Sequence, residues 1–165
     1  MHDFGSKVAQ KASSLVGAPY RVGGFCPDRG IDCLGLWFLS GASVNEALLA
    51  PMRVLEKITL YGKRSFDPTS GRIGATVEQW ISESDTDRAF SLESYVKEVP
   101  AEEAEAGDLL IYKSASRGWV CDFHCAVVAN NPRYVYHASG AVGVVRTDRG
   151  NLPTPERNAW RFRCQ

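Results

Sequence analysis

The sequence lacks the features of a membrane protein and of a typical nucleic-acid-binding protein. No apolar run in its 165 residues approaches the length of a membrane span. Lysine plus arginine and aspartate plus glutamate balance at 19 each, so the chain has no formal net charge. This balance argues against nucleic acid as the main partner, because such a partner requires a basic surface.

The first residues also lack a secretory signal peptide. Residues 1–6 have neither a basic start nor an apolar segment. We therefore expect a protein that is made in the cytoplasm and that either stays there or leaves by another route, unless the chain has been trimmed.

The chain has few cysteines, and their number is odd. The five residues are Cys26, Cys33, Cys121, Cys125 and Cys164. At least one thiol is outside any disulfide, and so few cysteines in this length favour a reducing compartment. The composition, 44% apolar and 23% charged, is that of a soluble globular protein, and the length predicts one domain over residues 1–165.

Helical patterns come first in the chain and strand patterns come last. Helices are predicted over 3–16, 33–41 and 44–49, with Pro51 ending the third. Strands are predicted over 108–112, 124–129, 134–137, 142–147 and 158–163, joined by short turns. This order predicts an α+β fold, with N-terminal helices packed on a C-terminal antiparallel sheet of about five strands.

Residues 53–100 give the weakest pattern and are interpreted as a variable insertion within the domain. A capping box over residues 76–79 predicts a short helix after it. Ser91 is a candidate cap for another helix that would run through Leu92, Tyr95 and Val96.

Asp32 and Cys33 indicate the start of a helix that carries a nucleophile. Asp32 is a favoured N-cap residue, and an apolar run over 34–39 follows it. Cys33 then occupies the first helical position, where unpaired backbone N–H groups and the helix dipole favour a thiolate. Gly35 leaves space beside the cysteine, at a cost in helix propensity. The glycine- and proline-rich residues 17–30 predict a shaped loop.

Two histidines are predicted to share one face of the sheet. Residues 130–133 are typical of a four-residue hairpin loop, which pairs Ala126 with His137. His124 lies two residues from Ala126, so the histidines become diagonal neighbours, about 7–8 Å apart at Cα. A register shift of one residue would put them on opposite faces.

Cysteine and two histidines form a possible nucleophile, base and orienting group. In this arrangement His124 accepts the thiol proton and later protonates the leaving amine, and His137 fixes the tautomer of His124. Taken singly, each residue has an ordinary structural explanation: a buried Cys33 in the core and two histidines as plain strand residues. The chain order, Cys, then His, then a third polar group, matches papain-type catalysis and favours the catalytic interpretation.

Three blocks of sequence resemble the NlpC/P60 family of cell-wall cysteine peptidases. They are Pro19-Tyr20-x-x-Gly23-Gly24-x-x-Pro27-x-x-x-x-Asp32-Cys33-x-Gly35-Leu36, then Ala106-Gly-Asp-Leu-Leu110 followed by His124 and Ala126-Val-Val128, then Tyr136-His-Ala-Ser139. The resemblance implies a papain-like fold and hydrolysis of amide bonds in peptidoglycan stem peptides. The implied bond joins γ-D-glutamate to a diamino acid such as meso-diaminopimelate, and no metal or cofactor is implied.

The same resemblance implies roles for five residues. Cys33 corresponds to the nucleophile, His124 to the base and His137 to the orienting residue. Tyr20 matches a tyrosine that helps to stabilise the oxyanion or to position substrate, and Asp32 matches a residue that in some members meets the amino end of the stem peptide.

The sequence also departs from the common family pattern. Leu34 stands where many members have serine, which looks more like the branch linked to phage tails and gene transfer agents. No SH3-type or peptidoglycan-binding module is visible. The protein is therefore expected to act on wall fragments, or to be delivered to the wall by a phage-tail-like assembly or another partner.

Three alternatives stay open at this point. Cys121, His124 and Cys125 offer zinc ligands, with Cys26 or Cys33 completing a tetrahedron, although the spacing is poor and adjacent strand residues point to opposite faces. The domain could instead be an acyltransferase or an amidase on another amide. It could also be a non-catalytic structural or binding module of a tail.

Overall fold

The computed structural model describes residues 2–21, 23–53, 94–113, 123–152 and 156–163. Its elements are α1 (His2–Ser14), β1 (Phe25–Cys26), β2 (Gly30–Ile31), α2 (Cys33–Ala42), β3 (Val96–Val99), β4 (Leu109–Lys113), β5 (Phe123–Val128), β6 (Tyr134–Ser139), β7 (Gly143–Asp148) and β8 (Glu156–Phe162), with short 3₁₀ helices at Glu46–Leu48, Ala101–Glu103 and Arg149–Asn151. The helix predicted after residues 76–79 lies outside the described residues.

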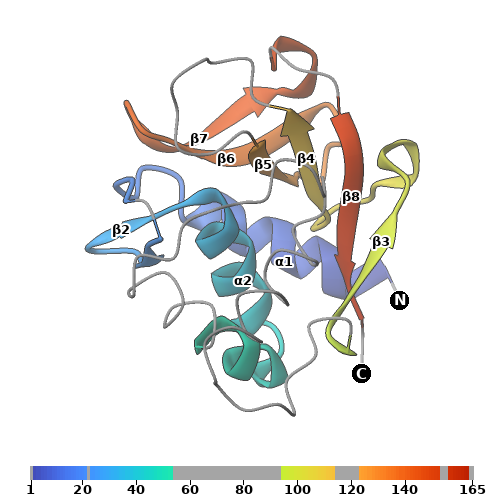
Figure 1. Ribbon diagram of the computed structural model, residues 1–165, viewed down its shortest axis with the longest axis horizontal. Helices are drawn as coiled ribbons and strands as arrows, with labels where there is room; N and C mark the ends of the chain where they lie inside the picture. The colour runs from blue at the N-terminus through green and yellow to red at the C-terminus, as the bar shows by residue number, and fades with distance from the viewer. Residues whose placement is uncertain (1, 22, 54–93, 114–122, 153–155, 164–165) are drawn as a thin grey trace.

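The predicted α+β class is confirmed. Figure 1 shows α1 and α2 together on one side of the large sheet, with the small β1–β2 hairpin beside them. The large sheet has six strands in the order β3-β8-β4-β5-β6-β7, and every neighbouring pair is antiparallel. The sequence predicted five of these strands, β4 to β8, and missed the edge strand β3.

The helix predicted through Tyr95 and Val96 is wrong, because residues 96–99 form β3 and pair with β8. Val96 packs in the main core and Val99 in a second cluster on the other face of the sheet. Two exposed residues separate them. The prediction rested on the helical spacing of Leu92, Tyr95 and Val96, whereas pairing with β8 makes Val96 the first residue of a strand. This strand also places the end of the expected insertion inside the domain's own sheet.

The third predicted helix begins later than expected and continues past Pro51. Residues 46–48 form a 3₁₀ turn, and residues 49–53 are helical. Pro51 therefore lies near the start of this segment. There its missing N–H costs nothing, because the first N–H groups of a helix have no intrahelical acceptor.

Helix α1 ends at Ser14, two residues before the predicted end at residue 16, and a turn leads from it to Gly17, which has a left-handed backbone. Gly17 has a φ of 93°, a conformation that other residues adopt only with strain. Its N–H donates to the carbonyl of Val144 at 2.9 Å, and the N–H of Val144 donates to the carbonyl of Ala18 at 2.9 Å. The end of α1 is thus tied to the start of β7.

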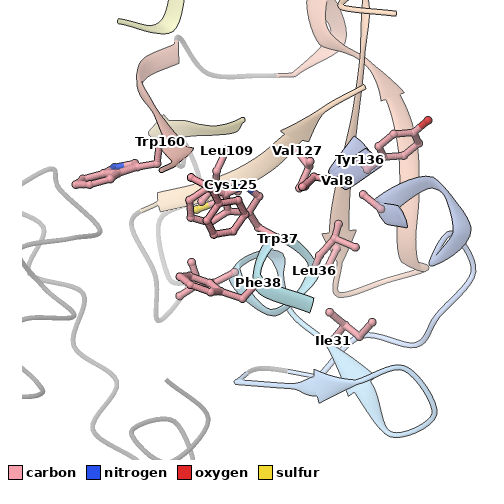
Figure 2. Packing of buried hydrophobic residues seen from close by; sticks show 14 of the residues in the cluster. Val8, Ile31, Leu36, Trp37, Phe38, Leu109, Cys125, Val127, Tyr136 and Trp160 are labelled. Atoms are coloured by element: carbon pink, nitrogen blue, oxygen red, sulfur yellow. The ribbon is translucent and has the colours of Figure 1, made fainter. Parts of the chain in front are cut away.

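The main core lies between the two helices and the sheet. Trp37 of α2 stacks on Phe162 of β8, with ring centroids 3.9 Å apart, and its indole N–H donates to the carbonyl of Gly107 at 2.8 Å. Figure 2 shows Trp37 and Phe38 of α2 among residues of the sheet, including Leu109 and Val127. Because almost every residue of α2 is buried, this helix is held firmly against β5 and β6.

The opposite face of the sheet carries a smaller apolar cluster. Its members come from four central strands, from β3 and from the 3₁₀ turn after it: Val99, Ala101, Leu110, Tyr112, Ala126, Val128, Val135 and Ala159. Both faces of the sheet are therefore covered.

One ion pair is buried where β4 and β8 meet. Asp108 is 3% exposed, and its two carboxylate oxygens accept hydrogen bonds of 2.8–3.1 Å from Arg161. The backbone N–H of Glu105 also donates to this carboxylate, at 2.8 Å. Arg161 donates in addition to the carbonyl of Glu103 at 2.9 Å. Burial raises the pKa of Asp108, and the hydrogen bonds from Arg161 counteract that rise.

In the described ranges, no helix has the length and apolar character needed to cross a bilayer.

Candidate functional site

The loop before Cys33 is fixed by the carboxylate of Asp32. One oxygen accepts the N–H of Gly35 at 2.7 Å, which makes Asp32 the N-cap of α2 as predicted. The other oxygen accepts the N–H of Gly23 at 2.7 Å. One side chain thus joins the loop to the helix start and holds Cys33 at the first helical position, as expected.

Gly35 is required by the loop rather than by the cysteine. A Cβ at this position would lie 2.0 Å from the carbonyl oxygen of Gly24. The Gly24 carbonyl accepts the N–H of Asp32 at 3.2 Å. Gly35 was predicted to leave space beside the thiol. That space is filled instead by the β1–β2 hairpin, which packs directly on the first turn of α2.

Replacing Gly35 with alanine is expected to destabilise the protein by about 1–3 kcal/mol, because either the hairpin or the helix must move. The same shift would displace Cys33 and lower turnover. The matched control is Gly150→Ala, whose added Cβ would meet only the Asp148 side chain, at 3.3 Å. Urea unfolding of both variants measures the difference, and equal midpoints would contradict the close approach.

The predicted hairpin register is confirmed for the residues next to the turn. Val128 pairs with Val135 and Val127 pairs with Tyr136. Beyond these pairs the described parts of β5 and β6 separate, so the expected pairing of Ala126 with His137 is not part of the ladder. Cys33, the first residue of α2, lies beside this stretch of β6, with its Sγ atom close to the Ala138 carbonyl.

The side chains of Cys33, His124 and His137 lie together where β5 and β6 no longer pair. The Sγ atom of Cys33 lies 3.4 Å from Nδ1 of His124 and 3.2 Å from the carbonyl oxygen of Ala138. Nε2 of His124 lies 2.9 Å from Nδ1 of His137. The two imidazole rings are perpendicular, with centroids 4.8 Å apart. The structure therefore brings together the three residues that the sequence selected, in the predicted order of contact.

The chain of contacts continues to a fourth residue. Nε2 of His137 lies 2.9 Å from Oγ1 of Thr147 on β7. Thr147 was not among the site residues predicted from the sequence. The signal that could have found it is the register of the β6–β7 hairpin, in which His137 pairs with Val145 and Thr147 is the next residue on the same face.

Burial keeps the base uncharged. Desolvation, with a smaller contribution from the charge of His137, lowers the pKa of His124 from its ordinary value to about 4. Desolvation also lowers the pKa of His137. On β4, Tyr112 pairs directly with His124 and is almost completely buried. At neutral pH the His124 imidazole is therefore neutral and can accept a proton from the thiol.

These shifts predict acid sensitivity of the fold. In the unfolded chain His124 binds a proton below its ordinary pKa of 6.5. In the folded chain it binds that proton only near pH 4. Stability should therefore fall as the pH drops from 6.5 to 4, by roughly 3 kcal/mol from His124 alone. Urea unfolding at several pH values measures this loss.

The matched comparison for acid sensitivity is His124→Gln against His2→Gln. The first substitution removes the buried titrating group and should flatten the pH dependence. The second changes a histidine outside the site and should leave the dependence as in the wild type. A wild-type stability that is constant between pH 6.5 and 4.5 would contradict the buried, neutral His124.

Backbone contacts place Tyr20 and Asp32 near the nucleophile. Tyr20 forms a parallel bridge with Ile31, two residues before Cys33, and its side chain packs in part against the main core. Asp32 uses both carboxylate oxygens on backbone N–H groups. This geometry gives Asp32 a structural role, and its predicted contact with a substrate amine stays a prediction.

The cysteine nearest to His124 in sequence does not share its environment. Cys125 is buried in the main core, on the face opposite to the second cluster. Among the residues that the structure describes, no group of three or more His, Cys, Asp or Glu side chains could hold a metal ion. Cys121, one of the candidate zinc ligands, lies outside those residues.

Comparison with known families and with curated proteins gives no match to this chain. Comparison with solved structures gives matches that include three proteins of the NlpC/P60 family. NlpC2 from Trichomonas vaginalis has a TM-score of 0.54 at 15% identity, over 94% of this chain and 45% of that one. A lipoprotein-like protein of the NLP/P60 family from Staphylococcus aureus has a TM-score of 0.53 at 19% identity, over 99% of this chain and 42% of that one.

The third structure is the NlpC/p60 domain of the peptidoglycan hydrolase SagA, with a TM-score of 0.49 at 18% identity, over 94% of this chain and 96% of that domain. The fold assignment rests on the other two. An α+β chain with a cysteine at a helix start and two histidines on adjacent strands thus has the NlpC/P60 fold.

Proposed function

We propose that this protein is a cysteine peptidase of the NlpC/P60 type, with Cys33 as nucleophile, His124 as base and His137 as orienting residue. The observation that carries the proposal is the continuous set of contacts from Sγ of Cys33 through both nitrogens of His124 to Nδ1 of His137. A half-buried imidazole within hydrogen-bond reach of a thiol at a helix N-terminus is an arrangement that supports cysteine acyl transfer.

The reaction would proceed in two halves. The Cys33 thiol gives its proton to Nδ1 of His124 as the sulfur attacks the amide carbon, and the resulting oxyanion lies near the helix start, where backbone N–H groups can donate to it. His124 then protonates the leaving amine as the C–N bond breaks, which leaves a thioester. A water molecule gives a proton to His124 while it attacks the thioester, and the departing Cys33 sulfur regains that proton.

The proposed substrate is a stem peptide of peptidoglycan, cut at the bond between γ-D-glutamate and a diamino acid such as meso-diaminopimelate. The three sequence blocks around Tyr20, His124 and His137 support this choice, and the shared NlpC/P60 fold is consistent with it. Action on wall fragments, or delivery to the wall by a phage-tail-like assembly, is part of the same proposal.

The test is digestion of purified muropeptides by wild type and Cys33→Ala, read by mass spectrometry. Cleavage at the γ-D-glutamyl bond by the wild type alone is the expected result. Cleavage that survives in Cys33→Ala would overturn the mechanism. No cleavage by the wild type would overturn the substrate and would leave a binding module or another amide as the function.

An added amine separates hydrolysis from acyl transfer. With glycinamide in the reaction, a hydrolase yields mainly the free acid, whereas an acyltransferase yields mainly the amide of the acyl fragment. A predominantly amide product would replace hydrolysis by transfer and leave the role of Cys33 unchanged.

A further inference from the structure

We propose that Thr147 is a positioning residue, whose hydroxyl accepts the Nε2 proton of His137 and thereby keeps Nδ1 of His137 available to His124. The proposal rests on the proposed function, since it concerns the same site. Its physical basis is the 2.9 Å contact between Nε2 of His137 and Oγ1 of Thr147.

The position of Thr147 is fixed by the sheet. His137 pairs with Val145 across β6 and β7, and Thr147 pairs with Val135. His137, Val135 and Thr147 therefore share one face, and Thr147 is a diagonal neighbour of His137. A β-branched residue has restricted rotation about χ1 and suits a strand, so the hydroxyl has few alternative positions.

The proton positions along the chain of contacts follow from the chemistry of the pair. Once His124 has taken the thiol proton, both of its ring nitrogens carry hydrogen. The N–H at Nε2 of His124 must then donate to Nδ1 of His137, which lies 2.9 Å away. A neutral His137 that accepts at Nδ1 carries its own proton on Nε2, and that N–H points to Oγ1 of Thr147.

The opposite tautomer would block the reaction. If His137 carried its proton on Nδ1, it would donate to Nε2 of His124. Neutral His124 would then carry hydrogen on Nδ1, the nitrogen that faces the thiol, and could not accept the thiol proton. A partner that accepts from Nε2 of His137 selects against this state. His137 is half-buried, so without Thr147 its Nε2–H would lose an acceptor in a partly desolvated position.

The matched variants are Thr147→Val and Thr147→Ser. Valine keeps the shape and the branching at Cβ but removes the hydroxyl, whereas serine keeps the hydroxyl. The first measurement is the proton position on His137, from long-range ¹H–¹⁵N correlations in protein labelled on histidine nitrogen at pH 7. Wild type and Thr147→Ser should show the Nε2–H form, and Thr147→Val should show the Nδ1–H form or a mixture.

The second measurement is alkylation of Cys33 by iodoacetamide, followed by mass spectrometry of the peptide that contains it. Thr147→Val should slow this reaction at pH 7 on the order of tenfold, with the rate restored at a pH high enough to ionise the thiol directly. Thr147→Ser should react like the wild type. Neither measurement needs a substrate, so both remain decisive if muropeptides are not cleaved.

Several results would overturn the proposal. One is an unchanged His137 tautomer together with an unchanged alkylation rate in Thr147→Val. Another is equal slowing in Thr147→Val and Thr147→Ser, because the hydroxyl would then not be the cause. If muropeptides are cleaved, kcat should fall in Thr147→Val with KM unchanged, and a rise in KM alone would also contradict a positioning role.

Discussion

Replacing His124 with glutamine is expected to lower kcat on the order of 10³-fold, because a neutral amide cannot take the thiol proton or return it to the leaving amine. Glutamine retains hydrogen-bonding groups at a buried position, so the polar contact to His137 has a substitute. The loss should appear in kcat more than in KM, since the interaction is made during proton transfer.

The measurement is single-turnover cleavage of a muropeptide that the wild type accepts. His2→Gln is the control, since it removes the chain's remaining histidine without touching His124 or His137. A second readout needs no substrate: alkylation of Cys33 near neutral pH should slow in His124→Gln and remain fast in His2→Gln. Retention of wild-type turnover in His124→Gln would remove His124 from the mechanism.

Replacing Arg161 with methionine is expected to destabilise the fold by about 3–5 kcal/mol, because it leaves the carboxylate of Asp108 buried without its cation. Asp108 is 3% exposed and receives three hydrogen bonds from Arg161, whose own side chain is 27% exposed. Loss of the cation should move the pKa of this carboxyl further above its ordinary value, so that it binds a proton more readily.

Arg133→Met provides the matched control for this pair. Arg133 bridges to Asp148 at 2.7 Å, but its side chain is 69% exposed, and such solvent-screened surface pairs contribute little to stability. Urea unfolding at neutral pH should therefore separate the two variants clearly. The loss in Arg161→Met should shrink on acidification, as Asp108 becomes neutral. Equal losses from both variants would contradict the buried pair.

The parts of the site that sequence predicted are those encoded by neighbouring residues. An N-cap followed by an apolar run placed Cys33 at the start of a helix, and a four-residue loop set the hairpin register next to the turn, where Val128 pairs with Val135. Both signals are local, so they were readable without knowing what packs on either element.

The parts that sequence missed depend on contacts between distant segments. Gly35 is explained by the Gly24 carbonyl, which only the folded hairpin brings to the helix. Residues 96–99 form the strand β3 because they pair with β8, which lies more than fifty residues later in the chain. Thr147 enters the site through a second hairpin register, and Asp108 is paired by an arginine from the last strand. In each case the partner, rather than the local pattern, decides the role.

The separation of the site's residues along the chain links the activity to biosynthesis. The thiol and the imidazole that faces it are 91 residues apart, and the Ala138 carbonyl beside the thiol is 105 residues from it. Closing loops of this length is slow and entropically costly. During synthesis the segment that carries Cys33 is made well before the residues of β5 and β6, so its thiol is at first without the base. For the proposed hydrolase, packing of β5 and β6 beside α2 is therefore the step that completes the site.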